Sequence, residues 1–349
     1  MLKKNILVIV LLTVSAVLFG QGVYQFPNPD FENWSKVTGK GGDVPADWHT
    51  FSAMKCDLPW YAAIGCPVAK NNHSNRVQGV SGYAVELFPK TIAGVLANGA
   101  LTTGQTRVKE MDPGHRDNYN FDPEGYRWKF NGRPDSIAFY AKSNGGMEGK
   151  AFFKVFLHDG NTFIDRSTDE LDGTAYGTMI IAFHPVSTWK RFSKVVTYKS
   201  SKTPQLLLGS FSTNRKAGEG SAKDRLALDK LRCVYDKQLS LLEIDGVSQE
   251  EMLRLFNDAE LATHDGLTND GSNSGVCALD YPLGVTEWAC GTFPVVNAAA
   301  KSKLVLDCAV QQATRENPVS TITVTHNDGS TFVYSIQYVS GAPLATNAR

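Results

Sequence analysis

Two acidic residues, Asp122 and Glu124, lie two positions apart in a stretch rich in aromatic side chains. Tyr119, Tyr126 and Trp128 flank them. Glycoside hydrolysis uses two carboxyl groups about 5 to 10 Å apart across a cleft. The pair is therefore a candidate general acid and base, and the alternative is a solvated acidic turn. No Ser-His-Asp, P-loop or HExxH pattern supports another class of hydrolase.

Sugar binding requires less than hydrolysis does. An aromatic face stacks on the apolar face of a pyranose, and a few amide, carboxylate or guanidinium groups bind the hydroxyls. Residues of these types cluster in two stretches, and the candidate binding residues are Trp60, Tyr61, Asn118, Tyr126, Arg127 and Trp128.

The Trp60–Tyr61 pair lies between Cys56 and Cys66, which enclose a short loop and are the best candidates for a disulfide. Adjacent aromatic residues point to opposite faces of an extended chain, so we expect one of them to be exposed. The alternative is a loop that folds back and buries both. Cys277 and Cys290 are the next candidate pair. No cysteine or histidine spacing predicts zinc.

The stretch after residue 23 reads Asn28-Pro29-Asp30-Phe31-Glu32-Asn33-Trp34, and a late strand reads Leu228-Asp229-Lys230-Leu231. Asp229 shares its parity with apolar residues of that strand, and a carboxylate on such a side must be paired or metal-bound. The two segments resemble the opening and closing strands of carbohydrate-binding jelly rolls. The resemblance implies that Glu32 and Asp229 lie together and hold a structural calcium ion. The alternative is a hydrogen-bonded Asp229 without a metal.

A second resemblance rests on the segment Trp128-Lys129-Phe130-Asn131-Gly132-Arg133-Pro134, followed by a strand that ends near Lys142. It is similar to a bacterial family of carbohydrate-metabolism domains, whose members were first named "putative glycoside hydrolases". The segment Asn98–Gly104 and the Asp229 strand extend the resemblance over most of residues 24–237. The family implies a jelly roll and partner proteins of a polysaccharide-use system.

Residues 1–20 have the pattern of a signal peptide. Lys3 and Lys4 precede an apolar run from Ile6 to Phe19, and small residues follow at 20–22. The run is shorter than the ~20 residues that span a bilayer, so cleavage is favoured over an uncleaved anchor. We therefore expect an exported protein (periplasmic, cell-surface or secreted) whose mature chain has no membrane span.

The whole chain has 349 residues, with 35 Lys and Arg against 35 Asp and Glu. This balance gives no electrostatic reason to expect nucleic acid as a partner. Short apolar runs separated by Gly, Pro, Asn and Asp predict an all-β protein. The length suffices for two domains, and we place a jelly-roll domain of the galactose-binding, carbohydrate-binding-module type at 21–237.

Residues 238–349 start a new pattern. Ser248-Gln249-Glu250-Glu251 is a capping-box signature that predicts a short helix. Four alternating strands follow from residue 293, and Asn327-Asp328-Gly329 predicts a tight hairpin. The arrangement resembles Ig-like β-sandwich modules of exported glycan-handling proteins, to which we assign no chemistry.

Three functions are compatible with these features. Carbohydrate binding ranks first because it requires only an aromatic face and a few polar groups, whereas hydrolysis also requires a spaced pair of carboxyl groups. Glycoside hydrolysis by a carboxylate pair is the alternative, and a non-catalytic surface adhesion or structural protein is the third.

Overall fold

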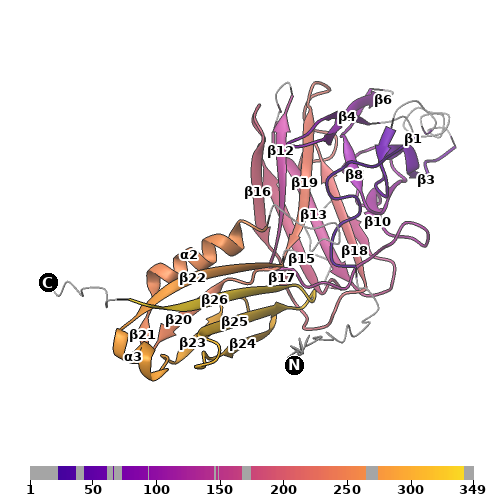
Figure 1. Ribbon diagram of the computed structural model, residues 1–349. Coiled ribbons are helices and arrows are strands. Elements are labelled where there is room, and N and C mark those ends of the chain that lie inside the picture. The colour runs from indigo at the N-terminus through magenta and orange to yellow at the C-terminus, as the bar shows by residue number, and fades with distance from the viewer. Residues whose placement is uncertain are drawn as a thin grey trace, which may run out of the picture.

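The computed structural model describes residues 23–36, 43–60, 66, 73–92, 94–144, 147, 149–166, 174–264 and 274–341. The predicted signal peptide and Tyr61 lie outside these residues. The described chain forms a larger and a smaller β-sandwich (Figure 1). We call residues 23–235 the first unit and residues 239–341 the second unit.

Two antiparallel sheets form the sandwich of the first unit. One sheet has the order β11 (Trp128–Lys129), β18 (Leu206–Ser212), β13 (Ala151–His158), β15 (Gly177–Phe183) and β17 (Thr197–Tyr198), and β8 (Ala100–Thr102) also pairs with β18. The other has the order β16 (Lys190–Val195), β12 (Ser136–Ser143), β19 (Leu226–Val234), β5 (Tyr83–Leu87) and β4 (Ser74–Gln78). Large apolar side chains from both sheets, such as Phe139, Phe153 and Leu228, are fully buried between them. Burial of this apolar surface is the main stabilising contribution.

A third sheet lies over the outer face of β13 and β18. It has the order β14 (Ile164–Arg166), β10 (Tyr119–Phe121), β9 (Gln105–Val108) and β3 (Lys55–Cys56), and we call it the outer sheet. Phe156 and Leu208 point out of the sandwich and pack with Phe163, which precedes β14. Two small hairpins, β1 (Trp34–Lys36) with β2 (Asp43–Pro45) and β6 (Lys90–Ile92) with β7 (Val95–Ala97), complete the strands of this unit.

The second unit has two sheets around its own core. The smaller consists of β21 (Val247–Ser248), β20 (Leu239–Ile244) and β23 (Val296–Ala300). The larger consists of β22 (Gly275–Leu283), β26 (Thr331–Ser340), β25 (Val319–His326) and β24 (Val305–Gln311). Helix α2 (Glu250–Leu261) buries Phe256 against Tyr334, with ring centroids 5.0 Å apart. A short helix, α3 (Val285–Cys290), follows β22.

The predicted all-β class, with a jelly-roll sandwich followed by a smaller sandwich, is confirmed. The Ig-like character of the second unit stays a prediction. The division at residues 237 and 238 is a proposal, supported because Tyr235 belongs to the first core and Leu239 to the second.

Two details of the second unit differ from the sequence-based expectations. Helix α2 begins as predicted, but its N-cap residue is Gln249 and makes no side-chain capping bond. Cys277 and Cys290 are both free thiols, because β22 holds Cys277 beside Tyr334 of β26. The parallel pairing of β22 with β26 joins segments far apart in the chain, so no local sequence pattern predicts it.

The hairpin between β25 and β26 contacts the first unit at the junction between the sandwiches. Asn327 exchanges two hydrogen bonds of 2.9 Å with the backbone N–H and carbonyl of Arg133. His326 Nε2 lies 2.9 Å from Asp135 Oδ2, and Ser302 donates to the other carboxylate oxygen of Asp135 at 2.5 Å. His326 also packs on Tyr235, with ring centroids 5.2 Å apart. These contacts fix the second unit against the first.

Within the described residues, no helix has the length and apolar character that crossing a bilayer would require.

Candidate functional site

The outer sheet presents one polar row to the interior and another to solvent. Successive side chains of a strand alternate between its faces. Thr106, Asn120 and Asp165 are cross-strand neighbours on the inner face. Thr106 Oγ1 donates to Asn120 Oδ1 at 2.8 Å, and Lys154 Nζ of β13 donates to Asp165 Oδ1 at 2.8 Å. The first contact joins β9 to β10 within the outer sheet, and the second, which is buried, holds the outer sheet on the sandwich.

The next residues along each strand form the outward row. Arg107 of β9, Tyr119 of β10 and Arg166 of β14 are direct cross-strand neighbours. The guanidinium carbons of Arg107 and Arg166 lie 5.6 Å and 5.7 Å from the centroid of the Tyr119 ring. An aromatic ring is thus set between two cations, which attract its electron-rich face and hold it in position.

Hydrogen bonds orient the Arg107 side chain. Its Nη1 donates to Tyr119 Oη at 2.6 Å, and its Nε donates to Asp57 Oδ2 at 2.7 Å. The bonds to Tyr119 and Asp57 raise the pKa of Arg107 above its ordinary value. The side chain is therefore a fixed cation, and its fork of donors suits hydroxyl or carboxylate oxygens.

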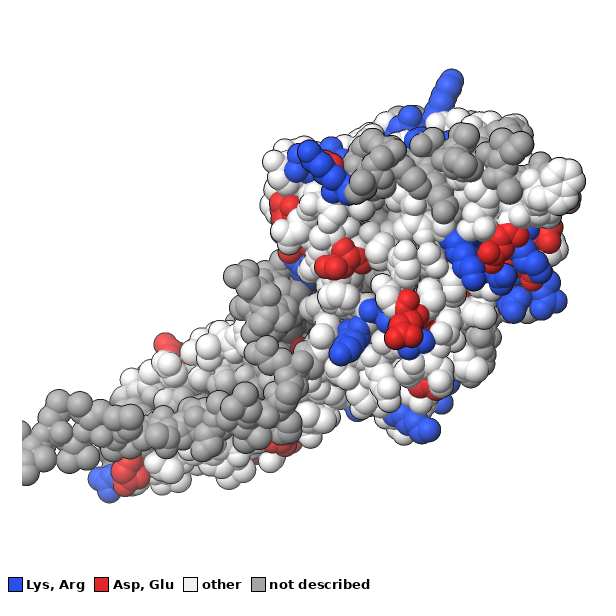
Figure 2. Space-filling model, turned by 90° about the vertical axis from the view of Figure 1, so that its right-hand side faces the viewer, with Lys and Arg blue, Asp and Glu red and all other residues white. Residues whose placement is uncertain are grey.

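Acidic side chains lie among these cations. Asp117 accepts a hydrogen bond from Lys109 Nζ at 3.0 Å and lies 3.9 Å from Arg166 Nη1. The bond from Lys109 lowers the pKa of Asp117 below its ordinary value. Basic and acidic side chains are intermixed on the side of the first unit that carries β3 and β10 (Figure 2). The face therefore offers both donors and acceptors beside an aromatic ring.

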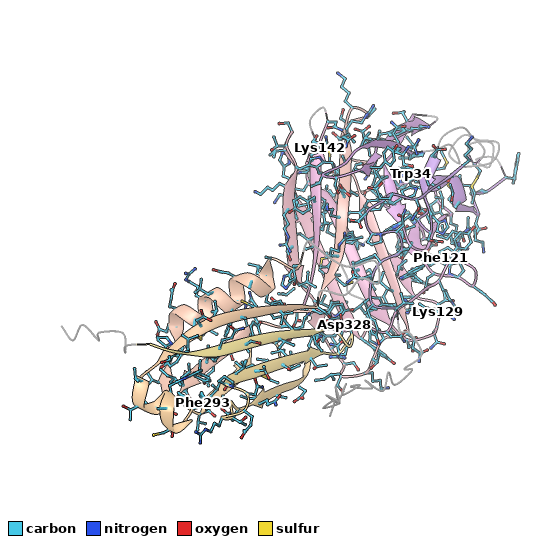
Figure 3. All side chains as sticks on the ribbon, in the orientation of Figure 1. Trp34, Phe121, Lys129, Lys142, Phe293 and Asp328 are labelled. Carbon is cyan, nitrogen blue, oxygen red and sulfur yellow. A yellow bond between two sulfur atoms is a disulfide. The ribbon has the colours of Figure 1, made fainter. Side chains whose placement is uncertain are left out.

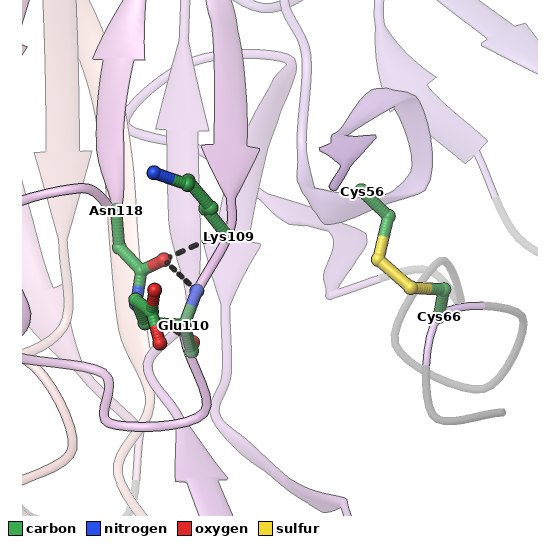
Figure 4. The surroundings of a disulfide bond; sticks show 5 residues. All are labelled: Cys56, Cys66, Lys109, Glu110 and Asn118. Atoms are coloured by element: carbon green, nitrogen blue, oxygen red, sulfur yellow. Dashed lines mark hydrogen bonds between the residues drawn. A yellow bond between two sulfur atoms is a disulfide. The ribbon is translucent and has the colours of Figure 1, made fainter. Parts of the chain in front are cut away.

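Trp60 belongs to the loop that follows β3. Its side chain is 87% exposed, the highest value among the large hydrophobic residues that the structure describes as exposed. Cys56 forms the predicted disulfide with Cys66, with Cα atoms 6.1 Å apart (Figure 4). Because Cys56 pairs with Val108 of β9, the disulfide ties Cys66, which follows Trp60 in the chain, to the outer sheet.

Asn118, a predicted binding residue, is buried and has a structural role. Its Oδ1 accepts hydrogen bonds from the backbone N–H groups of Lys109 and Glu110 at 2.8 Å and 3.0 Å (Figure 4). Its Nδ2 donates to the carbonyl oxygens of Glu110 and Asp112. The side chain closes the loop between β9 and β10 and so positions Tyr119 next to it.

The other three predicted binding residues lie away from the outward row. Trp128 packs against the core of the first unit, and its Nε1 donates to the Gln25 carbonyl at 2.9 Å. Tyr126 is half-buried and packs edge-on against His49, with centroids 4.8 Å apart. Arg127 is exposed but donates to the Asp122 carbonyl and to Thr162 Oγ1.

The two candidate catalytic carboxylates differ in exposure. Glu124 is exposed, whereas Asp122 is fully buried. Asp122 Oδ1 accepts the Phe163 N–H at 2.6 Å, and Oδ2 lies 3.1 Å from His158 Nε2. The two acids therefore do not share one exposed surface, because Asp122 is bound to the backbone of Phe163 in the interior.

Glu32 and Asp229 both contact the turn between β4 and β5. Asp229 is fully buried; its Oδ2 accepts the Val80 N–H and its Oδ1 the Lys230 N–H, both at 2.7 Å. Glu32 Oε1 accepts the Tyr83 N–H at 3.0 Å. Burial raises the pKa of Asp229 to about 6.

This turn has the composition of a calcium site. A Cβ added at Gly79 would lie 2.5 Å from Asp229 Oδ2 and 2.8 Å from the Ser81 carbonyl oxygen, and one at Gly82 would lie 1.9 Å from Glu32 Oε1. Because these glycines have no side chain, several oxygen atoms can lie close together at this turn. Oxygen atoms are the ligands that calcium prefers. Both oxygens of Asp229 and Oε1 of Glu32 accept one N–H each, and each of these oxygens keeps a second lone pair. The residues present therefore fit the ion that the resemblance implies.

A second cluster of residues that could bind a metal ion lies between β9 and β10. Ligand atoms of Glu110, His115 and Asp117 lie within 4.8 Å of one another. His115 Nδ1 accepts the Asp117 N–H at 3.2 Å, which leaves the proton of the neutral ring on Nε2. Asp117 also forms an ion pair with Lys109. These contacts favour a hydrogen-bonded loop over a metal site.

The sequence did not single out Arg107, Tyr119 and Arg166 as binding residues. The alternation Tyr119-x-Phe121 was the available signal for a strand there. The two arginines carried no signal, because only the cross-strand register brings them to Tyr119.

No family model and no curated protein matches the chain. Solved structures with partial likeness include a "putative glycoside hydrolase" from Bacteroides thetaiotaomicron, which is 15% identical over 59% of this chain and 70% of that chain, with a TM-score of 0.42. A family 61 carbohydrate-binding module in complex with β-1,4-galactotriose is 12% identical over 59% of this chain and 94% of that chain, with a TM-score of 0.26. A family 11 module from Clostridium thermocellum in complex with a mixed-linked tetrasaccharide is 13% identical over 45% of this chain and 79% of that chain, with a TM-score of 0.23. Because every score is below 0.5, the function is inferred from the geometry of the chain itself.

Proposed function

We propose that the protein binds carbohydrate polymers on the outward face of the outer sheet. The observation that carries the proposal is the Tyr119 ring held between Arg107 and Arg166, with Asp57 and Asp117 beside them. An aromatic face beside fixed polar groups suits the apolar face and the hydroxyls of a sugar ring. Trp60 supplies a second exposed aromatic side chain on the loop after β3.

A binding role accounts for this face better than hydrolysis does. Its acids form pairs with neighbouring basic side chains, and the carboxylate pair suggested by the sequence is split between the interior and the surface. The adhesion alternative would leave the ordered arginine–tyrosine row without a role.

Export is part of the same proposal. Two features support it: the signal-like pattern of residues 1–20 and the Cys56–Cys66 disulfide, since disulfides persist in oxidising compartments. A calcium ion held by Glu32 and Asp229 would be structural, because both contact the turn between β4 and β5 and neither contributes to the outward row.

The test measures retention of soluble neutral and acidic polysaccharides by the mature chain, residues 21–349, in affinity gels. Tyr119→Ala should weaken binding of the retained glycan at least ~10-fold, which corresponds to about 1.4 kcal/mol. Tyr83→Ala is the matched control, since Tyr83 is also a tyrosine with an arginine, Arg76, over its ring, but lies on β5. Equal retention by both variants would contradict the proposal.

A reducing-sugar assay on the same polysaccharides addresses hydrolysis. We expect no released reducing ends. Release that Glu124→Gln abolishes would establish the enzymatic alternative instead.

A further inference from the structure

A pocket of about 300 Å³ lies in the second unit, to which the sequence assigned no chemistry. Its lining residues are Trp288, Ala289, Gly291, Phe293, Arg315 and Pro318. Figure 3 places Phe293 at the end of the second unit remote from Asp328, which belongs to the hairpin at the junction. The pocket is therefore separate from the outer sheet.

Two aromatic side chains form a corner in this pocket. The rings of Trp288 and Phe293 are nearly perpendicular, at 86°, with centroids 6.1 Å apart. Phe293 in turn packs on Tyr338 of β26, with centroids 5.3 Å apart, so it is anchored to the larger sheet. Trp288 remains 36% exposed. A large, partly exposed indole supported by a fixed ring is a surface on which a flat apolar ligand face can stack.

Gly291 brings a cation to this corner. It ends α3 in the left-handed conformation, with φ of 66°, and its N–H bonds back to the Glu287 and Trp288 carbonyls. A Cβ at this position would lie 3.0 Å from Cγ of Arg315. Glycine is therefore needed both for the conformation and for the close approach of the arginine stem.

Arg315 lines the pocket without a protein counter-ion. It makes no ion pair within 4.0 Å and no side-chain hydrogen bond with any residue in the described part of the chain. Glu316 follows it in the sequence and Glu287 lies on α3, but neither forms an ion pair with it. An unpaired guanidinium keeps its fork of donors available for a planar anion such as a carboxylate.

We propose that this pocket binds an acidic sugar, a uronic acid residue of a polysaccharide. The ring stacks in the Trp288–Phe293 corner, and the carboxylate pairs with Arg315. The volume is at the lower limit of small-molecule sites, which suits one sugar residue rather than a long segment. The proposal rests on the proposed function of the protein but assigns a second site and a ligand charge.

The experiment titrates the mature chain with trigalacturonate and, as the neutral match, with α-1,4-galactotriose, using calorimetry. Arg315→Gln and Trp288→Ala should each weaken trigalacturonate binding at least ~10-fold, with the Arg315→Gln effect fading at high salt. Arg315→Gln should leave galactotriose binding within ~2-fold. Lys303→Gln is the control, because it removes one exposed positive charge elsewhere in the same unit.

Tyr119→Ala, measured in parallel, separates the two proposals. Trigalacturonate binding that Tyr119→Ala removes and Arg315→Gln does not would overturn the pocket and leave the outer-sheet site standing. Binding that depends on Arg315 and not on Tyr119 would establish the pocket alone. No trigalacturonate binding, or an Arg315-dependent preference for poly-glutamate over trigalacturonate, would overturn the uronate assignment. Thermal unfolding of each variant confirms that the fold is retained.

Discussion

At the scale of single residues, Asp122 and Glu124 differ in environment although they are two positions apart. Asp122 bonds to the backbone of Phe163, and Glu124 is exposed. The sequence placed both in an aromatic-rich segment and could not reveal that Phe163, 41 residues later, binds only one of them. The exposure of a polar side chain depends on tertiary packing, which cannot be predicted from composition or from the alternation of residues along a strand.

The burial of Asp122 gives a stability prediction. Asp122→Ala leaves the buried Phe163 N–H without its acceptor, which should cost about 1–3 kcal/mol of unfolding free energy. Glu124→Ala should change it by less than ~0.5 kcal/mol. Urea denaturation of both variants measures the difference. Loss of glycan binding by Asp122→Ala at unchanged stability would contradict the structural role.

At the scale of elements, strand β19 shows where the alternation of side chains fails as a guide. Asp229 is buried as expected, but residues on both faces of β19 are buried. Leu228 and Leu231 belong to the same core although they are three positions apart, because the register shifts at Lys230, whose φ is 48°. Strands such as β13, whose eight residues are all buried, were nevertheless predicted from short apolar runs. The outer sheet was not, because its strands have two to four residues and are separated by polar loops.

The calcium expectation becomes a prediction at this scale, since the ion would join the opening segment, the β4–β5 turn and β19. Adding calcium at 100 times its dissociation constant should stabilise the chain by about 2.7 kcal/mol. Asp229→Asn should lose this response in thermal unfolding, whereas Glu219→Gln, a change in an exposed acid, should keep it. An unchanged midpoint for the parent chain with calcium would leave Asp229 as a hydrogen-bonded residue without a metal.

At the scale of the whole molecule, the junction could not be predicted from the sequence. Asp135 and His326 are 191 residues apart, and neither segment has an unusual local pattern. The hairpin at Asn327-Asp328-Gly329 was predicted from its turn residues, but its contact with Arg133 depends on how the two sandwiches pack.

The junction gives a pH prediction. Burial alone would raise the pKa of Asp135, but hydrogen bonds from His326 and Ser302 outweigh it and hold the pKa below its ordinary value of 3.8. Stabilisation by the ionised form is therefore present above pH 3.8 and is lost as the pH falls through the lower folded-state value. Asp135→Asn should lower the unfolding free energy at pH 7 by about 1.5–3 kcal/mol and flatten the acid limb of the stability profile.

Asp258→Asn is the control for Asp135→Asn, because Asp258 is an exposed acid on α2 that pairs with Arg254. Small-angle X-ray scattering should show a wider range of arrangements of the two units in Asp135→Asn only. Identical acid limbs for the parent and Asp135→Asn chains would contradict the role of this carboxylate.

The fixed junction also sets a distance. If the two units keep one arrangement, the outer sheet and the Trp288 pocket stay at one distance from each other. A polymer can then occupy both sites only if it is long enough to span that distance. Avidity would then begin at a threshold chain length, while shorter fragments would bind each site singly and dissociate quickly. Through its contact with the first unit, the hairpin between β25 and β26 would thus make binding depend on the length of the polymer.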